Sequence, residues 1–118
     1  MRAGVSCESD YCRERREMIL VYITCKDKEE AVKVSRVLLE NKLVACTNFF
    51  PINSMYWWKG KIEEDNEFVV VAKTKDDNYE KVKCMVEEVH SYDTPCVLSW
   101  KVDNLNKEYK DWMMDVLK

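Results

Sequence analysis

The stretch Met18-Ile-Leu-Val-Tyr-Ile-Thr-Cys25 decides the fold, because a continuous β-branched and apolar run predicts a central strand buried on both faces. Asp27 follows this strand, and Glu30 lies three positions later. This spacing is a variant of the capping box that begins a helix. Apolar residues then recur at helical spacing as far as about Asn41. The domain therefore begins with a strand followed by a helix.

The next segment predicts a long hairpin. β-branched and aromatic residues extend from Leu43 to Trp58, which is typical of a strand. Pro51 cannot donate a ladder hydrogen bond, so we expect this strand to be bulged, bent or at a sheet edge there. Gly60 supplies the positive φ that hairpin turns often need. The chain should turn at Gly60 into a third strand.

The second half of the chain repeats the pattern of strand and helix. The run Phe68-Val-Val-Val-Ala72 predicts a third strand that is apolar on both faces. Asp77 and Glu80 form a second capping-box pattern, and apolar residues at helical spacing continue to His90. Residues 96–102 predict a fourth strand, and an amphipathic segment after it predicts a third helix.

This order of elements predicts a ferredoxin-like α+β fold, βαββαβ, with a four-stranded antiparallel sheet, a long bent hairpin and an extra C-terminal helix. Right-handed crossovers place the two main helices on one face of the sheet. The opposite face is then bare in a single subunit, although the third strand and an aromatic cluster offer apolar surface there. We therefore expect an oligomer, with Tyr56, Trp57 and Val70 at the interface.

Composition fits one globular domain. The 118 residues are 47% hydrophobic and 35% charged, so we assign residues 18–118 to a single domain and residues 1–17 to a flexible extension. The net charge is -3 with both signs interspersed, which argues against nucleic acid as a partner. The longest apolar run is far too short for a membrane helix. Six irregularly spaced cysteines without a signal-peptide pattern favour reduced thiols and a cytoplasmic location.

Five motifs resemble one known family. They are Asn41-Lys-Leu-Val-Ala-Cys-Thr-Asn48, Tyr56-Trp-Trp-Lys-Gly-Lys-Ile-Glu-Glu-Asp65, Lys73-Thr-Lys75, His90-Ser-Tyr-Asp-Thr-Pro95 and the segment from Asn106 to Trp112. In this order they resemble the divalent-cation tolerance (CutA) family, whose signatures include His-Pro-Tyr-x-x-Pro and Asn-x-x-Tyr-x-x-Trp. The resemblance implies a cytoplasmic homotrimer that is linked to tolerance of divalent metals, binds copper and has no enzyme activity.

Three positions depart from the family pattern. Ser91 stands where the family usually has Pro, and Cys96 stands where a Glu often follows the second Pro. The metal-binding cysteine described in some family members corresponds more nearly to Ile23 than to Cys25.

His90, Cys96 and Cys25 are the candidate metal ligands. His90 is the only histidine, so any imidazole site within one subunit must use it. The two thiols are soft donors of the kind that copper(I) or zinc prefers, on strands that this topology makes neighbours. The alternative is structural: two buried thiols and a hydrogen-bonded ring at a helix end. Copper or another divalent cation is thus a possible ligand, and none is expected to be required for folding.

A second set of residues suggests a ligand cleft. Trp58, Lys73, Tyr92 and Trp112 could line a space between subunits suited to an anionic or aromatic small molecule. Interface packing is the alternative role for the aromatic residues. The rival to a metal-responsive trimer is therefore a signalling or scaffold module that binds a small molecule or a protein. The family resemblance also implies kinship in architecture with trimeric nitrogen-regulatory proteins. The chain has no Gly-rich phosphate loop and no fixed pair of catalytic carboxylates, so no enzyme activity is expected.

Overall fold

The computed structural model describes residues 17–118, so the predicted extension lies outside the described residues except for its last position. Glu17 is held by the domain. Its carbonyl accepts a hydrogen bond from the Asp76 N–H at 2.9 Å, and its carboxylate lies 3.3 Å from the Lys101 ammonium. Glu17 therefore contacts the residues that begin η1 and end β4.

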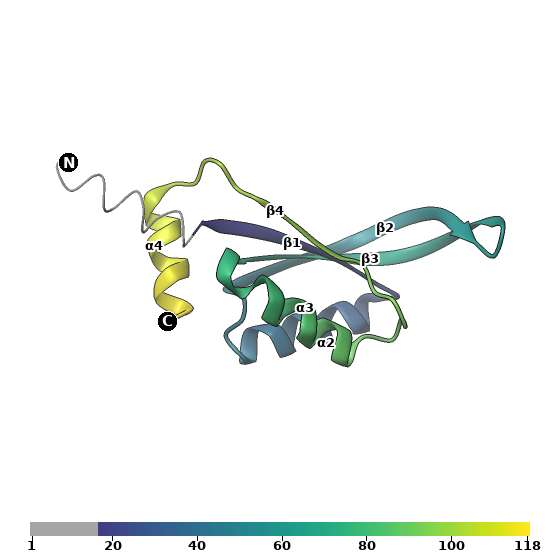
Figure 1. The fold of residues 1–118 in the computed structure, drawn as a ribbon, viewed down its shortest axis with the longest axis horizontal. Coiled ribbons are helices and arrows are strands. Elements are labelled where there is room, and N and C mark those ends of the chain that lie inside the picture. Colours follow the sequence, from purple (N-terminus) through teal and green to yellow (C-terminus); the bar gives the residue numbers. More distant parts are fainter. Residues whose placement is uncertain (1–16) are drawn as a thin grey trace.

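The described part of the chain contains four strands, three α-helices and one 3₁₀ turn. They are β1 (Met18–Cys25), α2 (Lys28–Glu40), β2 (Cys46–Trp58), β3 (Lys61–Lys75), η1 (Asp76–Asn78), α3 (Tyr79–Val89), β4 (Val97–Lys101) and α4 (Lys107–Val116). The sheet order is β2-β3-β1-β4 with every neighbouring pair antiparallel. Helices α2 and α3 lie side by side on one face of the sheet (Figure 1). The predicted ferredoxin-like α+β fold with its extra C-terminal helix is confirmed.

The main core lies between the sheet and helices α2 and α3. Alternate residues of β1 and β3 form its sheet side: Ile19, Val21, Ile23, Cys25, Val70 and Ala72. The helices contribute Ala31, Val34, Leu38, Val82 and Val86. This alternation follows from the pleat, which points successive side chains of a strand to opposite faces.

Val70 does not fit its predicted place at an interface. Its side chain is 0% exposed and packs in the main core, opposite Ile23 of β1. Its neighbours Val69 and Val71 point to the other face, because a shift of one residue along a strand changes the face. Tyr56 and Trp57 remain exposed, as an interface role would require of a single subunit.

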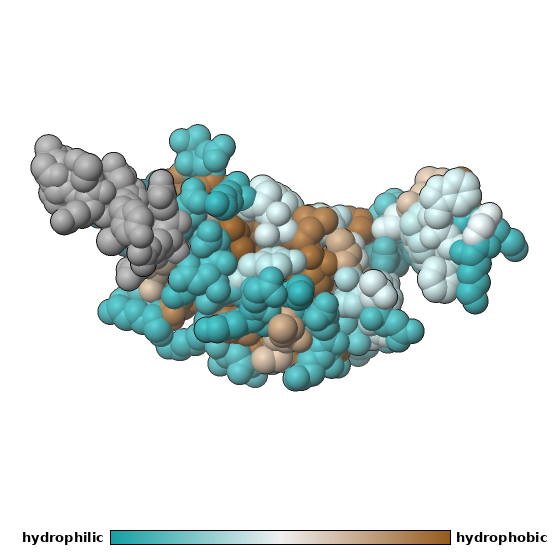
Figure 2. Space-filling view, in the orientation of Figure 1, coloured by the Kyte–Doolittle hydropathy of each residue, from teal (hydrophilic) through white to brown (hydrophobic). Residues whose placement is uncertain are grey.

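The face of the sheet opposite α2 and α3, here called the open face, keeps apolar residues in contact with solvent. Phe50, Leu98 and Trp100 are 43%, 45% and 46% exposed, and the ladder places all three on this face. Helix α4 packs over one end of it, through a small cluster formed by Met18, Ala45, Met113 and Leu117. In Figure 2, brown hydrophobic residues gather on the middle of the molecule, above the mostly teal surface of the helices.

The two helix starts differ from each other. Asp27 caps α2, since its carboxylate accepts the Glu30 N–H at 2.9 Å, and the first capping prediction is confirmed. The second capping prediction, which made Asp77 the cap of the next helix, is wrong. Asp77 lies inside the 3₁₀ turn, and Asn78 precedes α3 without capping it. The buried Asn78 amide donates instead to the Leu43 carbonyl at 3.1 Å and to the Thr74 hydroxyl at 3.2 Å, so it is not available to cap the helix.

The β2–β3 hairpin is much longer than the body of the sheet. Lys59 and Gly60, with φ values of 51° and 78°, form its turn in the left-handed geometry that matches strand twist. β2 is an edge strand, so the prediction for Pro51 is confirmed. Residues 52–67, which we call the arm, project from the domain and give the molecule extents of 58 × 28 × 21 Å (Figure 1).

Candidate functional site

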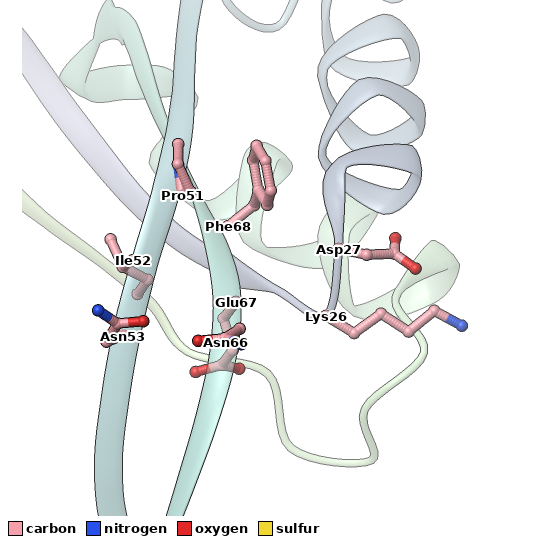
Figure 3. Close-up of a pocket in the computed structure, with 8 residues that line it drawn as sticks. All are labelled: Lys26, Asp27, Pro51, Ile52, Asn53, Asn66, Glu67 and Phe68. Atoms are coloured by element: carbon pink, nitrogen blue, oxygen red, sulfur yellow. The ribbon is translucent and has the colours of Figure 1, made fainter.

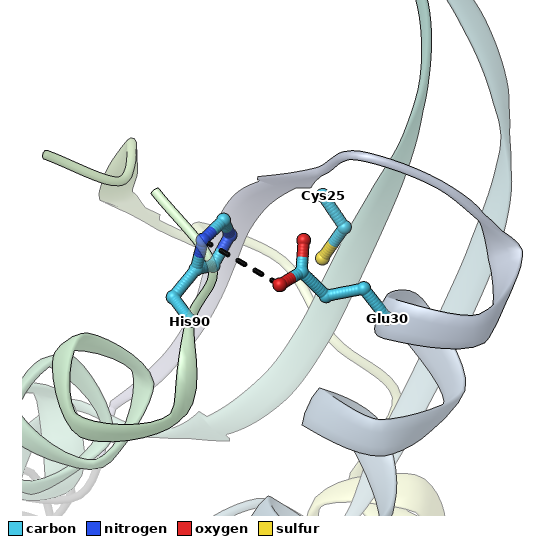
Figure 4. Close-up of side chains that lie close together, drawn as sticks. All are labelled: Cys25, Glu30 and His90. Atoms are coloured by element: carbon cyan, nitrogen blue, oxygen red, sulfur yellow. Dashed lines mark ion pairs between the residues drawn. The ribbon is translucent and has the colours of Figure 1, made fainter. Parts of the chain in front are cut away.

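Three side chains that can each bind a metal converge near the end of β1. The Cys25 thiol, a Glu30 carboxylate oxygen and a His90 ring nitrogen all lie within 4.8 Å of one another (Figure 4). Strand β1, the first turn of α2 and the residue after α3 supply them. The side chains of His90 and Glu30 are 0% and 5% exposed. Within residues 17–118 this is the one group of three such side chains.

Both ring nitrogens of His90 are already hydrogen-bonded. Nε2 lies 2.7 Å from the Thr24 carbonyl oxygen, and the Tyr92 N–H lies 3.0 Å from Nδ1. A carbonyl only accepts and an N–H only donates, so Nε2 carries the hydrogen and Nδ1 accepts. This arrangement fixes the tautomer and leaves neither nitrogen a free lone pair for a metal ion.

Each carboxylate oxygen of Glu30 accepts one backbone hydrogen bond. Its Oε1 accepts the Lys26 N–H at 2.9 Å, and its Oε2 accepts the Ser91 N–H at 2.8 Å and lies 3.8 Å from Nδ1 of His90. Burial by itself raises the pKa of Glu30, but the bonds from Lys26 and Ser91 lower it further than burial raises it. The carboxylate therefore stays ionised and accepts hydrogen bonds from two backbone N–H groups that belong to separate segments.

The Cys25 thiol lacks the properties of a metal ligand in this setting. Burial raises its pKa to about 12, and the nearby carboxylates of Glu30, Asp27 and Glu67 add to the effect. Metals bind the thiolate form, which this environment disfavours. The three side chains therefore form no preformed metal site, because both His90 nitrogens are engaged and the Cys25 thiol would have to lose its proton before it could bind an ion.

The predicted ligand set is only partly brought together. Cys25 and His90 meet, whereas Cys96 is not in the cluster. Burial and Glu67 raise the pKa of Cys96. Glu30 takes the third place, and sequence reasoning assigned it only to a helix cap. The signal for Glu30 was its position in the capping box, but no local pattern indicates its bond to Ser91, which lies 61 residues away.

The four predicted cleft residues lie in three separate places within one subunit. Tyr92 is next to the cluster, and its hydroxyl donates to Glu67 at 2.5 Å. Lys73 of β3 and Trp112 of α4 both lie near Tyr109: the Lys73 ammonium is 5.4 Å from the Tyr109 ring centre, and the ring centres of Tyr109 and Trp112 are 5.3 Å apart. Trp58 lies at the hairpin turn. A cleft that unites them needs more than one subunit and stays a prediction.

An open hollow of about 370 Å³ lies between the β1–α2 turn and the base of the arm. Its walls are Lys26, Asp27, Pro51, Ile52, Asn53, Asn66, Glu67 and Phe68 (Figure 3). The side chains of Lys26 and Asp27 point away from the two strands, so their charges do not converge on the hollow. None of the predicted cleft residues lines it.

The fold and the cluster together define a small ferredoxin-like protein with a projecting hairpin, in which His90 and Glu30 take their hydrogen-bond partners from the protein itself. Residues 19–116 match the family model for the CutA1 divalent ion tolerance protein, and the chain belongs to this family. None of its described helices is both long and apolar enough to cross a membrane.

Individual relatives agree with this assignment. The chain is 42% identical over 101 residues to the divalent-cation tolerance protein CutA of Pyrococcus horikoshii. This alignment covers 86% of this chain and 99% of that protein. It is 35% identical to Protein CutA of Homo sapiens, over 80% of this chain and 54% of that protein. Both are named as CutA proteins and neither name denotes an enzyme.

Solved structures match the fold closely. The CutA of Archaeoglobus fulgidus superposes with a TM-score of 0.84 at 40% identity, covering 86% of this chain and 99% of that one. CutA1 of Pyrococcus horikoshii gives a TM-score of 0.82 at 40% identity, covering 85% and 98%. The Archaeoglobus protein is described as periplasmic, and the cytoplasmic location expected for this chain stays a prediction.

Proposed function

We propose that this divalent-cation tolerance protein works as a homotrimer that binds copper or another divalent ion weakly and catalyses no reaction. Membership of the family supports the role in cation tolerance. The observation that carries self-association is the uncovered apolar surface of the single subunit, on the open face and on the arm, and the number of three subunits rests on the family resemblance.

The amount of exposed aromatic surface is unusual for a monomer. Trp57 on the arm is 73% exposed, and Trp58 beside it is also exposed. Together with Phe50, Leu98 and Trp100 of the open face, they form surface that soluble monomers rarely leave in water. At ~25 cal/mol per Å² of apolar area removed from water, covering such a surface favours association. In a closed ring of identical subunits, every copy has its apolar surface covered in the same way.

Light scattering after size-exclusion chromatography tests the assembly. At micromolar concentration the full chain should give a mass about three times the 14.1 kDa of one subunit. A folded, stable monomer at that concentration would contradict the trimer.

Isothermal titration of the reduced protein tests metal binding. We expect saturable uptake of at least one of Cu⁺, Cu²⁺ and Zn²⁺. The donors should come from exposed side chains or from more than one subunit, because both nitrogens of the only histidine are engaged in the buried cluster. No saturable uptake of any of the three ions would overturn the metal-binding part of the proposal and leave the trimer untouched.

A further inference from the structure

The connection between α3 and β4, residues 90–96, has no regular secondary structure, yet it is tied to three other elements. The Ser91 N–H donates to Glu30 of α2, and the Tyr92 hydroxyl donates to Glu67 of β3. His90 bridges the connection to β1, through the Thr24 carbonyl. Irregular backbone is normally mobile surface structure, so this number of ties indicates that its position matters.

We propose that Glu30 and His90 are positioning residues that clamp this connection onto the end of β1, and that the clamp keeps metal ions out of the Cys25–Glu30–His90 cluster. The inference reverses the ligand role suggested for His90 and Cys25. It also restricts the proposed metal binding to donors outside the cluster, but the clamp itself holds whether or not the protein binds metal elsewhere.

The hydrogen bonds of His90 carry the argument. Each ring nitrogen has one bonding site, and each is used by a backbone group: Thr24 at Nε2 and Tyr92 at Nδ1. A metal ion at either nitrogen would leave a backbone group without its partner inside the protein. Buried backbone groups are costly to leave unpaired, so metal entry would have to compete with the bonds that fix the connection.

Glu30 holds the other side of the clamp. Its two oxygens join the Lys26 N–H, in the β1–α2 turn, to the Ser91 N–H. Both donors belong to turns that the sheet itself does not hydrogen-bond, and one carboxylate fixes them relative to each other. The Glu30 carboxylate therefore holds the α3–β4 connection in a fixed position relative to the β1–α2 turn.

The far end of the connection is held as well. The Tyr79 hydroxyl donates to the Val97 carbonyl at 2.7 Å, where β4 begins. At the near end, the Lys33 ammonium lies 3.2 Å from the Val89 carbonyl, where α3 ends. These contacts hold the connection where it leads from α3 into β4, an edge strand of the sheet.

Nuclear magnetic resonance of the full chain can test the clamp directly, because His90 is the only histidine and its ring ¹⁵N signals are unambiguous. We expect the signals of an imidazole protonated at Nε2 alone. Addition of Zn²⁺ or Cu⁺, both diamagnetic, should leave these signals in place up to several equivalents. A saturable shift of either nitrogen on adding metal would overturn the proposal.

Amide hydrogen exchange tests the positioning role. In Glu30→Gln, one of the two backbone donors faces an amide NH₂ group, so exchange at Ser91 or Lys26 should become about tenfold faster or more. Exchange at the β1 amides should change less, since they report opening of the whole sheet. Cys84→Ser, at an exposed thiol on α3, is the matched control and should leave both sets unchanged.

Unchanged exchange at Ser91 and Lys26 in a folded Glu30→Gln protein would contradict the clamp. If that variant does not fold, the metal titration of the wild-type His90 signals still decides between clamp and ligand. The two proposals also fail separately: absence of metal uptake anywhere removes the proposed binding, whereas metal at His90 removes the clamp.

Discussion

The two halves of β3 form the same ladder with β2 but have opposite surroundings. The inner half, residues 68–75, lies between β2 and β1 and contains four fully buried residues: Val69, Val70, Ala72 and Thr74. The outer half, residues 61–67, pairs with β2 alone and is acidic and largely exposed. One strand thus begins in solvent and ends in the core.

This difference shows which half of β3 is stabilised within a single subunit and which half is not. The inner half is fixed by packing against α2 and α3. The outer half is a two-stranded ribbon, and such a ribbon is only marginally stable in water without a further layer. The subunit core therefore accounts for the inner half, while the proposed assembly would account for the arm.

The largest effect is expected at the inner half, from Val70→Asp. A carboxylate there would be buried without a partner, which typically costs more than about 4 kcal/mol and is enough to unfold many domains. We expect loss of the folded state by far-ultraviolet circular dichroism.

Val71→Asp is the matched control, because it places the same charge one residue along, on the open face. It should leave the subunit folded and weaken assembly in light scattering. Equal unfolding by both variants would show that the two faces do not differ as the register indicates.

At the outer half, Trp57→Lys should dissociate the proposed trimer without unfolding the subunit. Large exposed tryptophans that become buried at interfaces commonly contribute about 2 kcal/mol or more, which corresponds to a dissociation constant raised roughly 30-fold. Dilution series in light scattering would measure this change. Glu64→Gln, an exposed position on the same arm, should leave assembly unchanged, and a Trp57→Lys protein with wild-type assembly would exclude the arm from the interface.

Sequence reasoning was accurate where a local pattern fixes the structure. The order of strands and helices follows from the spacing of apolar residues, and the start of α2 follows from Asp27 and Glu30. The turn at Gly60 follows from its freedom to adopt positive φ.

Sequence reasoning was less accurate where contacts between residues far apart in the chain determine the structure. Three consecutive valines have no alternation, so only the ladder between β1 and β3 reveals that Val70 faces the helices. The partners of His90 and Glu30 come from turns far along the chain, and spacing does not show them. Asp77 has the sequence of a cap, but a 3₁₀ turn occupies that position instead.

At the boundary of the two halves, Tyr92→Phe should lower the stability of the subunit by about 1–2 kcal/mol. It removes the hydrogen bond to the Glu67 carboxylate, and bonds to charged groups are stronger than neutral ones. Urea denaturation would measure the change. Tyr22→Phe on the open face serves as the control and should change stability by less than about 0.5 kcal/mol. A Tyr92→Phe protein as stable as the control would contradict the role of this bond.

The smallest effect is expected at the tip of the arm, from Gly60→Ala. No atom lies within 4 Å of the added methyl group, so the cost comes only from the left-handed backbone, about 1 kcal/mol. Asn tolerates this conformation better than Ala, so Gly60→Asn should recover part of the loss in urea denaturation. Equal stability of Gly60→Ala and wild type would show that the turn relaxes freely.

The length of the arm also has a kinetic consequence. Two diffusing proteins usually associate slowly compared with their collision rate, because small patches must meet in the right orientation. A ribbon that extends the molecule to 58 Å along one axis, against 28 and 21 Å along the others, widens the radius at which two copies first touch. In the proposed assembly the arms would make the encounter complex and the open faces would close afterwards, so shortening the hairpin should slow association even where the final contacts are kept.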